Sequence, residues 1–307
     1  MNSQVELSVV VPVYNGEDFI GQTIMSILSN SQGFNVECIV IDDGSTDRTP
    51  DILATFSGKV RIYRQENAGE SAAVNKGFQL AFGDFVVVVS ADDPVLTPKL
   101  FNGVVRFFEN SPRVVAWYPD WNVIDENDRI LKKIVLPEYD FNDLFSRNRV
   151  LPGPGTWIRK QAALDIGGRQ SKWKYVGDYD FWLRLSRIGK LAHRSEVLAQ
   201  WRKHARSTSI SERGSEMALE RIAVIEDFVS TYKETLDERE ISLARAHACY
   251  LAARLGYFSL DVNSRVLFVR SLKLDYRVLK SIKLYEALFM ISFPVSKKLL
   301  DLAWKFR

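Results

Sequence analysis

Two pairs of adjacent aspartates follow runs of apolar residues, which makes them the first candidates for chemistry. Asp42 and Asp43 end one such run, and Asp92 and Asp93 come shortly after another. Carboxylates at the end of a buried strand cost free energy unless they are paired or used. The first pair suits acceptance of hydrogen bonds from a ribose hydroxyl or a base N–H. The second supplies the hard oxygen ligands that suit Mg²⁺ or Mn²⁺, ions that in turn bind phosphate oxygens.

Both pairs also have a structural interpretation. Ser45 and Asp47 are typical of the region that caps a helix N-terminus. Asp93-Pro94 is typical of a turn that precedes a helix, here expected near 97–108. The residue types by themselves leave both interpretations open.

Two later segments combine a polar group with an apolar framework. Asp178 falls in the first turn of a predicted helix, 178–187, whose apolar face anchors it in a core. It suits a general base there, or it complements the helix dipole. Arg202 and His204 follow a predicted strand over 191–201. They are suited to hold a diphosphate and complete a metal site, or they belong to a solvated basic loop.

The segments that position these residues alternate between strands and helices. Continuous apolar runs rich in β-branched residues predict strands buried on both faces, over 7–13, 36–41, 60–63 and 85–89. Stripes of apolar residues at helical spacing separate them, over 17–29, 49–56 and 71–82. This alternation predicts an α/β fold with right-handed crossovers and a mostly parallel sheet. Ligands of such sheets bind beyond the carboxyl ends of the strands.

Composition and length bound the remaining possibilities. The 307 residues are 46% hydrophobic and 26% charged, which is globular and excludes a disordered chain, a collagen-like fibre or a disulfide scaffold. Basic and acidic residues nearly balance, 41 against 38, so the whole chain gives no argument for nucleic acid. From 212 onward the pattern is wholly helical. We therefore predict two domains, 1–211 and 212–307.

The C-terminal region is basic, with ten Lys or Arg and three Asp or Glu from 262 to 307. Lys273, Arg277, Lys280 and Lys283 recur on one helical face, as in helices that lie on an anionic membrane. Packing on the first domain or a homo-oligomer interface is the alternative. No signal peptide is evident at the N-terminus. We expect a cytoplasmic protein, free or peripheral on the inner face of the plasma membrane.

Six motifs in one order carry a resemblance to a known family. VVVPVYNG, IDDGSTD, ENAGESAAVNKG, SADD, GDYDFWLRL and WRKH occur between residues 6 and 210. The chain resembles the family 2 glycosyltransferases, nucleotide-sugar-dependent enzymes of glycan synthesis with the GT-A fold, a Rossmann-like sheet flanked by helices. Such a chain is expected to transfer a sugar with inversion, assisted by Mn²⁺ or Mg²⁺. The expected donor is a UDP-sugar, and the acceptor is a hydroxyl of a glycan or lipid-linked molecule, as in polysaccharide biosynthesis.

The resemblance also implies roles for matching residues. It places Pro12, Val13 and Tyr14 along the nucleobase and ribose, and Asp42 or Asp43 on the base. Asn67, Gly69 and Lys76 are expected in the segment that lines the nucleotide. Asp92 is expected to face the ribose or sugar, Asp93 to bind the metal, Asp178 to act as the catalytic base, and His204 to contact metal or diphosphate with help from Arg202. For the acceptor we expect Trp157 and Trp173, since aromatic rings suit stacking on sugars, although they equally suit core packing.

Two positions depart from the family pattern, and two other functions compete. Ser90 stands where the family usually has an acid, and Gly177 stands where it usually has Glu before the catalytic Asp. A sugar nucleotidyltransferase needs a Gly-rich loop with Lys or Arg after the first strand, which Tyr14-Asn15-Gly16 does not provide. A non-catalytic nucleotide-sugar-binding scaffold is the other alternative, and the presence of Asp93 and Asp178 argues against it.

Overall fold

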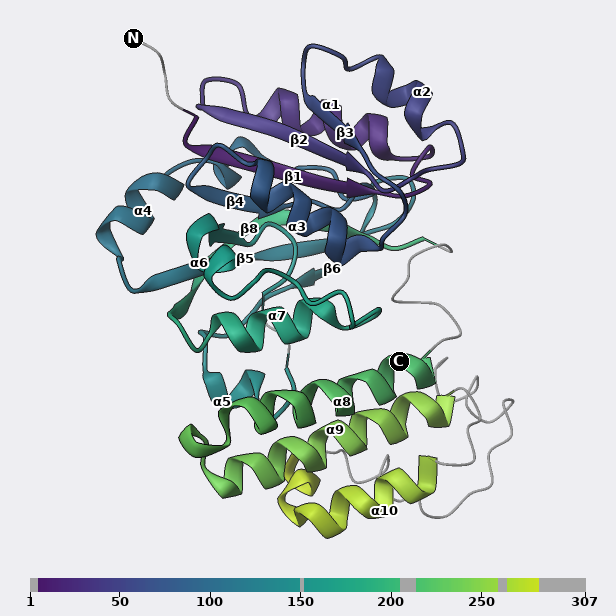
Figure 1. The fold of residues 1–307 in the computed structure, drawn as a ribbon, viewed down its shortest axis with the longest axis vertical. Helices are drawn as coiled ribbons and strands as arrows, with labels where there is room; N and C mark the ends of the chain where they lie inside the picture. Colours follow the sequence, from purple (N-terminus) through teal and green to yellow (C-terminus); the bar gives the residue numbers. More distant parts are fainter. Residues whose placement is uncertain (1–4, 150–151, 205–213, 259–263, 282–307) are drawn as a thin grey trace. The chain divides into compact units, whose positions relative to one another are not determined.

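The computed structural model describes residues 5–149, 152–204, 214–258 and 264–281. The chain divides into two compact units, shown in Figure 1. The first comprises Met1–Tyr139 and Leu151–His204, and the second comprises Asp140–Val150 and Ala205–Arg307. The segment 140–150 thus groups with the helical unit, whereas we had predicted an uninterrupted first domain over 1–211.

A central sheet organises the first unit. Its strand order is β3-β2-β1-β4-β7-β5-β6, with β8 paired to β5. The strands are β1 (Leu7–Val13), β2 (Val36–Asp42), β3 (Arg61–Arg64), β4 (Phe85–Val88), β5 (Val114–Ile124), β6 (Ile130–Ile134), β7 (Trp157–Arg159) and β8 (Lys190–Arg202). The first four are parallel to one another, β7 joins β4 and β5 in antiparallel fashion, β6 is antiparallel to β5, and β8 runs parallel to β5. The predicted α/β sheet is confirmed, with an antiparallel insertion in its second half.

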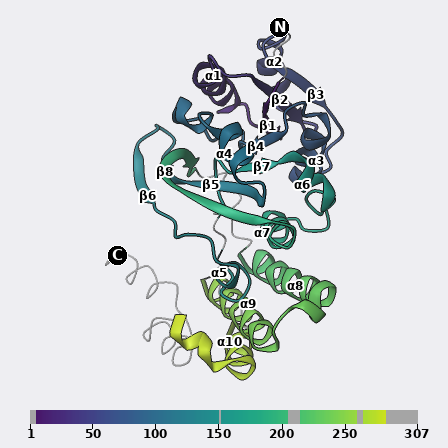
Figure 2. The same ribbon diagram turned by 90° about the vertical axis from the view of Figure 1, so that its left-hand side faces the viewer.

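Helices cover both faces of this sheet (Figures 1 and 2). The helices of this unit are α1 (Ile20–Asn30), α2 (Thr49–Ala54), α3 (Glu70–Leu80), α4 (Val104–Asn110), α6 (Lys160–Asp165) and α7 (Gly177–Leu185), with the 3₁₀ turn η1 (Pro98–Leu100). On one face Ile20 and Ile24 of α1 belong to the same hydrophobic core as Val9 of β1. On the other, Gly77 of α3 lies over Val10, where a Cβ would come within 2.2 Å of the valine side chain. Glycine costs about 1 kcal/mol in a helix but permits this close approach.

The helix predicted over 97–108 is interrupted. Thr97 caps η1 by accepting a hydrogen bond from Lys99 N, and α4 begins only at Val104. Gly103 between them has φ of +75°, which L side chains rarely adopt. The apolar periodicity runs through the glycine, so the sequence pattern predicts one helix where the backbone makes two.

The second unit has its own cores, built from α5 (Phe141–Leu144), α8 (Gly214–Tyr232), α9 (Glu238–Phe258), α10 (Ser264–Leu274) and the 3₁₀ turns η3 (Lys233–Thr235) and η4 (Tyr276–Ser281). The ring of Phe145 lies 5.4 Å from that of Phe228 on α8. Asn148 donates to the carbonyl of Ala244 on α9 and accepts from Arg221 on α8 through its own carbonyl, both at 3.1 Å. These contacts explain why 140–150 belongs here. Within the described residues, no helix has the length and apolar character needed to cross a membrane.

Candidate active site at the carboxyl edge of the sheet

The loops after β1 and β2 are joined by reciprocal hydrogen bonds. Asn15, with φ of 52°, accepts from Thr46 N through its side chain and donates its own N–H to Ser45 Oγ, at 2.8 and 2.9 Å. Asp47 accepts from Glu17 N and Thr49 N. Burial would raise the pKa of Asp47, but these bonds and one from the Thr49 hydroxyl outweigh it and lower the pKa. Ser45 and Asp47, for which a helix-capping role was the structural alternative, join the two loops, and Asp47 also accepts from the first residue of α2 (Thr49–Ala54).

The first aspartate pair is committed to the backbone. Asp43 is buried and accepts from Gln65 Nε2, Ala68 N and Gly69 N at 2.7, 2.9 and 2.8 Å. Asp42 is equally buried, accepts from Ser45 N at 2.9 Å and lies 3.6 Å from Arg64 Nε. A nucleobase, the predicted partner of one of these carboxylates, would compete with bonds that already hold the loops.

The side chains predicted to line the nucleotide are spread over these loops. Pro12 and Val13 are buried in β1, whereas Tyr14 is 52% exposed. Asn67 and Lys76 are exposed, the latter on α3. Gly69 is the N-cap residue before α3 and has φ of +88°, a backbone conformation that glycine adopts easily, and its N–H donates to Asp43. Of the predicted set, Tyr14, Asn67 and Lys76 present side chains at the surface.

The second aspartate pair differs because its two members have separate surroundings. Asp93 is buried, and its Oδ1 accepts from Arg202 N at 2.7 Å. Burial, with the neighbouring charge of Asp92, raises the pKa of Asp93 well above its usual range, against the opposing effect of the Arg202 N–H. The side chain of Asp92 remains 28% exposed, and its Oδ2 lies 2.7 Å from Nε2 of His204. Asp92 therefore has the more accessible carboxylate, whereas Asp93, the predicted metal ligand, is buried and accepts from the main chain.

Arg202 also lies elsewhere than predicted. Its side chain is 0% exposed, and its guanidinium donates to main-chain and side-chain oxygens of the surrounding protein. It is thus turned to the protein rather than to a diphosphate. Several of its partners, Gln22 and Asp128 among them, were absent from the sequence prediction, because residues far apart in the chain give no signal that they meet.

Asp178 lies at the start of α7 and is exposed. Its Oδ1 accepts from Tyr179 N at 2.7 Å. A Cβ on the preceding Gly177 would lie 3.0 Å from Ser71 Oγ at the start of α3. Since α3 begins just beyond the carboxyl end of β3, Asp178 lies at the same edge of the sheet as Asp92. A side chain at position 177 would require the Ser71 hydroxyl to shift.

An ion pair between two buried residues of α7 connects this helix to the loop before it. Asp180 and Arg184, both buried, pair at 2.6 Å, and Arg184 also donates to the carbonyls of Ile166 and Gly168. Asn75 of α3 accepts from Arg169 N at 2.8 Å. The loop before Asp178 is therefore fixed both to α3 and to α7.

The two tryptophans expected to bind the acceptor have different environments. Trp157 is fully buried on β7, where its Nε1 donates to the carbonyl of Leu100 at 2.9 Å, and its acceptor role is excluded by this burial. Trp173 is half-buried in the loop that leads to Asp178, with Lys172 Nζ 4.7 Å from the centre of its ring. Trp173 alone remains at a place that an acceptor could reach.

The residues present fit a divalent cation shared with a substrate. In the described part of the chain, no cluster of three or more His, Cys, Asp or Glu side chains is arranged for a metal ion. Asp92 and His204 supply one carboxylate oxygen and one imidazole nitrogen side by side. Cations such as Mg²⁺ commonly take one or two protein ligands and complete their coordination with phosphate oxygens.

Comparisons with known proteins agree with this architecture. An uncharacterised glycosyltransferase of Rickettsia prowazekii is 26% identical over 259 residues, covering 82% of this chain and 79% of the relative. The uncharacterised glycosyltransferase YibD of Escherichia coli is 37% identical over 180 residues, covering 57% and 48%.

Solved structures share the fold. S. aureus TarS 1–349 in complex with UDP-GlcNAc superposes with a TM-score of 0.56 at 17% identity, covering 91% of this chain and 93% of that one. The mannosyltransferase PcManGT of Pyrobaculum calidifontis, in complex with GDP-Man and Mn²⁺, gives 0.53 at 16% identity, covering 91% and 87%. Finally, the sequence profile of Glycosyl transferase family 2 matches residues 8–176, more than half of the chain. With that match and the sheet-edge site described above, the chain belongs to glycosyl transferase family 2.

Proposed function

We propose that this glycosyltransferase moves a sugar, with inversion, from a UDP-sugar to a hydroxyl of a glycan or lipid-linked acceptor in polysaccharide biosynthesis. The observation that carries the proposal is the Asp92–His204 pair, which lies at the same edge of the sheet as the exposed Asp178. The nucleotide-sugar complexes of TarS and PcManGT support a donor of this class.

Each residue has a defined task in this reaction. Asp92 and His204 would hold a divalent cation, Mn²⁺ or Mg²⁺. When bound, the cation would neutralise charge on the departing diphosphate. Asp178 accepts the proton of the acceptor hydroxyl while that oxygen bonds to the anomeric carbon. The bond from this carbon to the diphosphate oxygen breaks, and its electron pair leaves with the nucleotide. A single in-line displacement of this kind inverts the anomeric centre.

The test pairs binding with turnover. Purified protein is incubated with UDP-GlcNAc, UDP-glucose or GDP-mannose, with Mn²⁺ or with EDTA, and thermal stabilisation and nucleotide release are measured. We expect one UDP-sugar to stabilise the protein and to be consumed only with the metal. Asp178→Asn should keep the stabilisation and lose about 10²–10⁴-fold in rate.

Asp165→Asn, an exposed acid on α6, is the matched control and should leave the rate unchanged. Equal loss of binding and turnover in Asp178→Asn would contradict its role as the base. Stabilisation by GDP-mannose alone would replace UDP in the proposal.

An anionic membrane surface is proposed as the place where this reaction occurs, at the cytoplasmic face. On α10 and η4 the apolar residues Val266, Val269 and Tyr276 are exposed together with Lys273 and Lys280. Arg277, by contrast, pairs with Asp275, and Lys283 lies outside the described residues. A mixed apolar and cationic surface suits insertion among anionic head groups.

Liposome flotation tests this surface. Reversing Lys273 and Lys280 to Glu should lower partition to phosphatidylglycerol vesicles about tenfold or more, since each cation near such a surface contributes roughly 1 kcal/mol. Lys233→Glu, on η3 of the same unit, is the control. Equal flotation of all three proteins would reject the membrane surface.

A further inference from the structure

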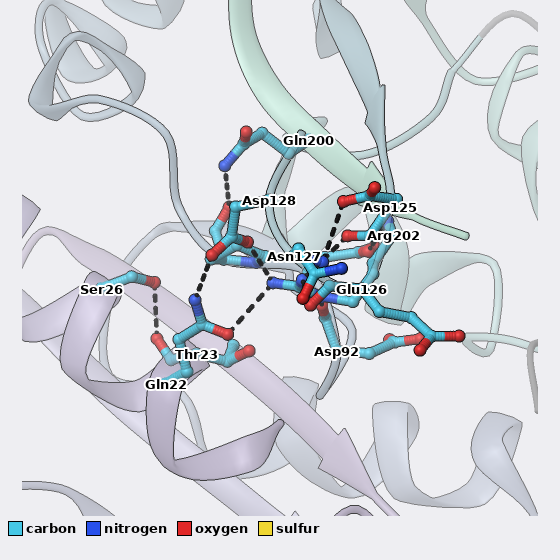
Figure 3. Close-up of polar contacts among 12 residues, drawn as sticks. Gln22, Thr23, Ser26, Asp92, Asp125, Glu126, Asn127, Asp128, Gln200 and Arg202 are labelled. Carbon is cyan, nitrogen blue, oxygen red and sulfur yellow. Dashed lines mark hydrogen bonds and ion pairs between the residues drawn. The ribbon is translucent and has the colours of Figure 1, made fainter. Parts of the chain in front are cut away.

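Arg202 is the point where four segments of the first unit meet. It is the last residue of β8, and Figure 3 shows its side chain between the α1 residue Gln22 and the turn that joins β5 to β6. All five N–H groups of a guanidinium are donors, and here each has an acceptor. Nη1 donates to the carbonyls of Asp125 and Glu126 at 3.1 and 3.2 Å. Nη2 donates to Gln22 Oε1 at 3.1 Å and to Asp128 Oδ1 at 2.7 Å.

The fifth donor and the main chain of Arg202 reach the proposed metal site. Nε donates to the carbonyl of Asp92 at 2.8 Å, and the main-chain N–H donates to Asp93 Oδ1 at 2.7 Å. His204 follows two residues later. The Phe19 ring contacts both, with its centre 4.8 Å from Arg202 Cζ and 5.1 Å from the His204 ring. Arg202 therefore fixes the main chain at Asp92 and at the end of β8, just before His204, while its own side chain stays buried.

Four residues accept hydrogen bonds from Nη1 and Nη2 of the guanidinium, and we call them the Arg202 clasp: Gln22, Asp125, Glu126 and Asp128. The turn is shaped by Asp125, whose carboxylate accepts from Asn127 N and Arg129 N. Asp128 has φ of 64° and binds two partners at once, Arg202 through Oδ1 and Gln22 Nε2 through Oδ2, the latter at 2.8 Å. Within the clasp, Asp128 supplies the carboxylate that pairs with the buried cation.

We propose that Arg202 and its clasp form a positioning device that sets how tightly the Asp92–His204 pair holds a divalent cation with a nucleotide diphosphate. The inference rests on the proposed function, because it concerns the same site. Groups that orient metal ligands from behind typically change metal affinity by about 10–100-fold when they are altered. Asp128→Asn removes the carboxylate that pairs directly with the buried guanidinium, which should loosen the end of β8 and the Asp92 carbonyl together.

The principal variant is Asp128→Asn, because asparagine tolerates the left-handed backbone and the site is half-exposed at 50%. Mn²⁺ is titrated calorimetrically into protein saturated with UDP, and separately with GDP. We expect Mn²⁺ to bind Asp128→Asn about tenfold more weakly than wild type, and Arg202→Lys up to about 100-fold more weakly. Nucleotide binding in EDTA should be unchanged, and raising Mn²⁺ should restore the initial rate of Asp128→Asn.

Glu196→Gln is the matched control, since Glu196 is a 45% exposed acid that pairs with Arg194 on the same strand, away from the clasp. It should bind Mn²⁺ as wild type does. If Asp128→Asn binds Mn²⁺ within twofold of wild type, the positioning inference is overturned and the proposed function stands. If wild type fails to bind Mn²⁺ both in the presence of UDP and in the presence of GDP, the proposed function fails and the inference fails with it.

Discussion

The two aspartate pairs of this protein look alike in sequence and differ in the burial and the hydrogen bonds of their carboxylates. Asp42-Asp43 lies at the end of β2 and Asp92-Asp93 follows β4, and both strands lie parallel beside β1. In the first pair both side chains are buried and accept main-chain N–H groups. In the second pair only Asp93 is used this way, and Asp92 stays partly exposed beside His204. Position at the sheet edge makes an acid available for chemistry only when the fold does not already use it.

The difference arises from the segments that arrive next to each pair. The first pair is met by the chain leading to α3, which brings three N–H groups to Asp43. The second is met by the end of β8, which brings one N–H to Asp93 and a histidine to Asp92. The same residue type thus becomes a structural support in one place and a candidate ligand in the other.

The largest effect expected from this comparison is on catalysis at Asp92. Asp92→Asn should lower the rate of sugar transfer by about 10²-fold or more, because it weakens the charge that stabilises the departing diphosphate. Asp42→Asn should cost less than about tenfold in rate. Initial rates over a range of Mn²⁺ concentrations measure both. A larger loss for Asp42→Asn would reverse the assignment of the two pairs.

A second effect is expected on stability at Asp43. Asp43→Asn should lower the free energy of unfolding by about 2–4 kcal/mol, since an amide cannot accept all three N–H groups that the carboxylate accepts. Urea unfolding followed by fluorescence measures it, with the exposed Asp51→Asn of α2 as the control. Stability equal to that of the control would mean that these bonds contribute little.

A smaller change is expected at Asp93, in the same measurement. Burial and the charge of Asp92 raise the pKa of Asp93, so its ionised form is less favourable in the fold than in the unfolded chain, and an amide still accepts from Arg202 N. Asp93→Asn should therefore alter the free energy of unfolding by no more than about 1 kcal/mol. A loss as large as that of Asp43→Asn would show that the two buried acids are equivalent after all.

The smallest effect concerns pH and the bonds between the first two loops. The pKa of Asp47 is lowered below its ordinary value of 3.8 in the fold, so its ionised form is bound more tightly in the native than in the unfolded state. The stabilisation is complete above that ordinary value and is lost as pH falls through the native pKa. The Tm of wild type should exceed that of Asp47→Asn at pH 6, and the gap should narrow below pH 4. A difference in Tm that is constant with pH would show that the hydrogen bonds to Asp47 do not depend on its charge.

The sequence predictions were most accurate where a local pattern decides the outcome. The strand at 7–13 matches β1 at both ends, and Asp178 falls in the first turn of α7 as the apolar spacing indicated. Predictions that depended on what a side chain meets were less accurate. Trp157 lies in the core instead of at an acceptor site, and Arg202 binds the β5–β6 turn and α1. Gln22 and Asp128 were missed because each is an ordinary polar residue until Arg202 lies between them.

By itself, the sequence determined the alternation of strands and helices, and with it the edge of the sheet where the acids would gather, because hydrophobic periodicity and turn residues act over short stretches of chain. Only the tertiary structure decided which of those acids keeps a partly exposed carboxylate. The N–H that occupies Asp93 comes from a residue 109 positions away, and those that occupy Asp43 come from the segment before α3. A hydrogen bond depends on distance in space, and the folded backbone alone sets that distance.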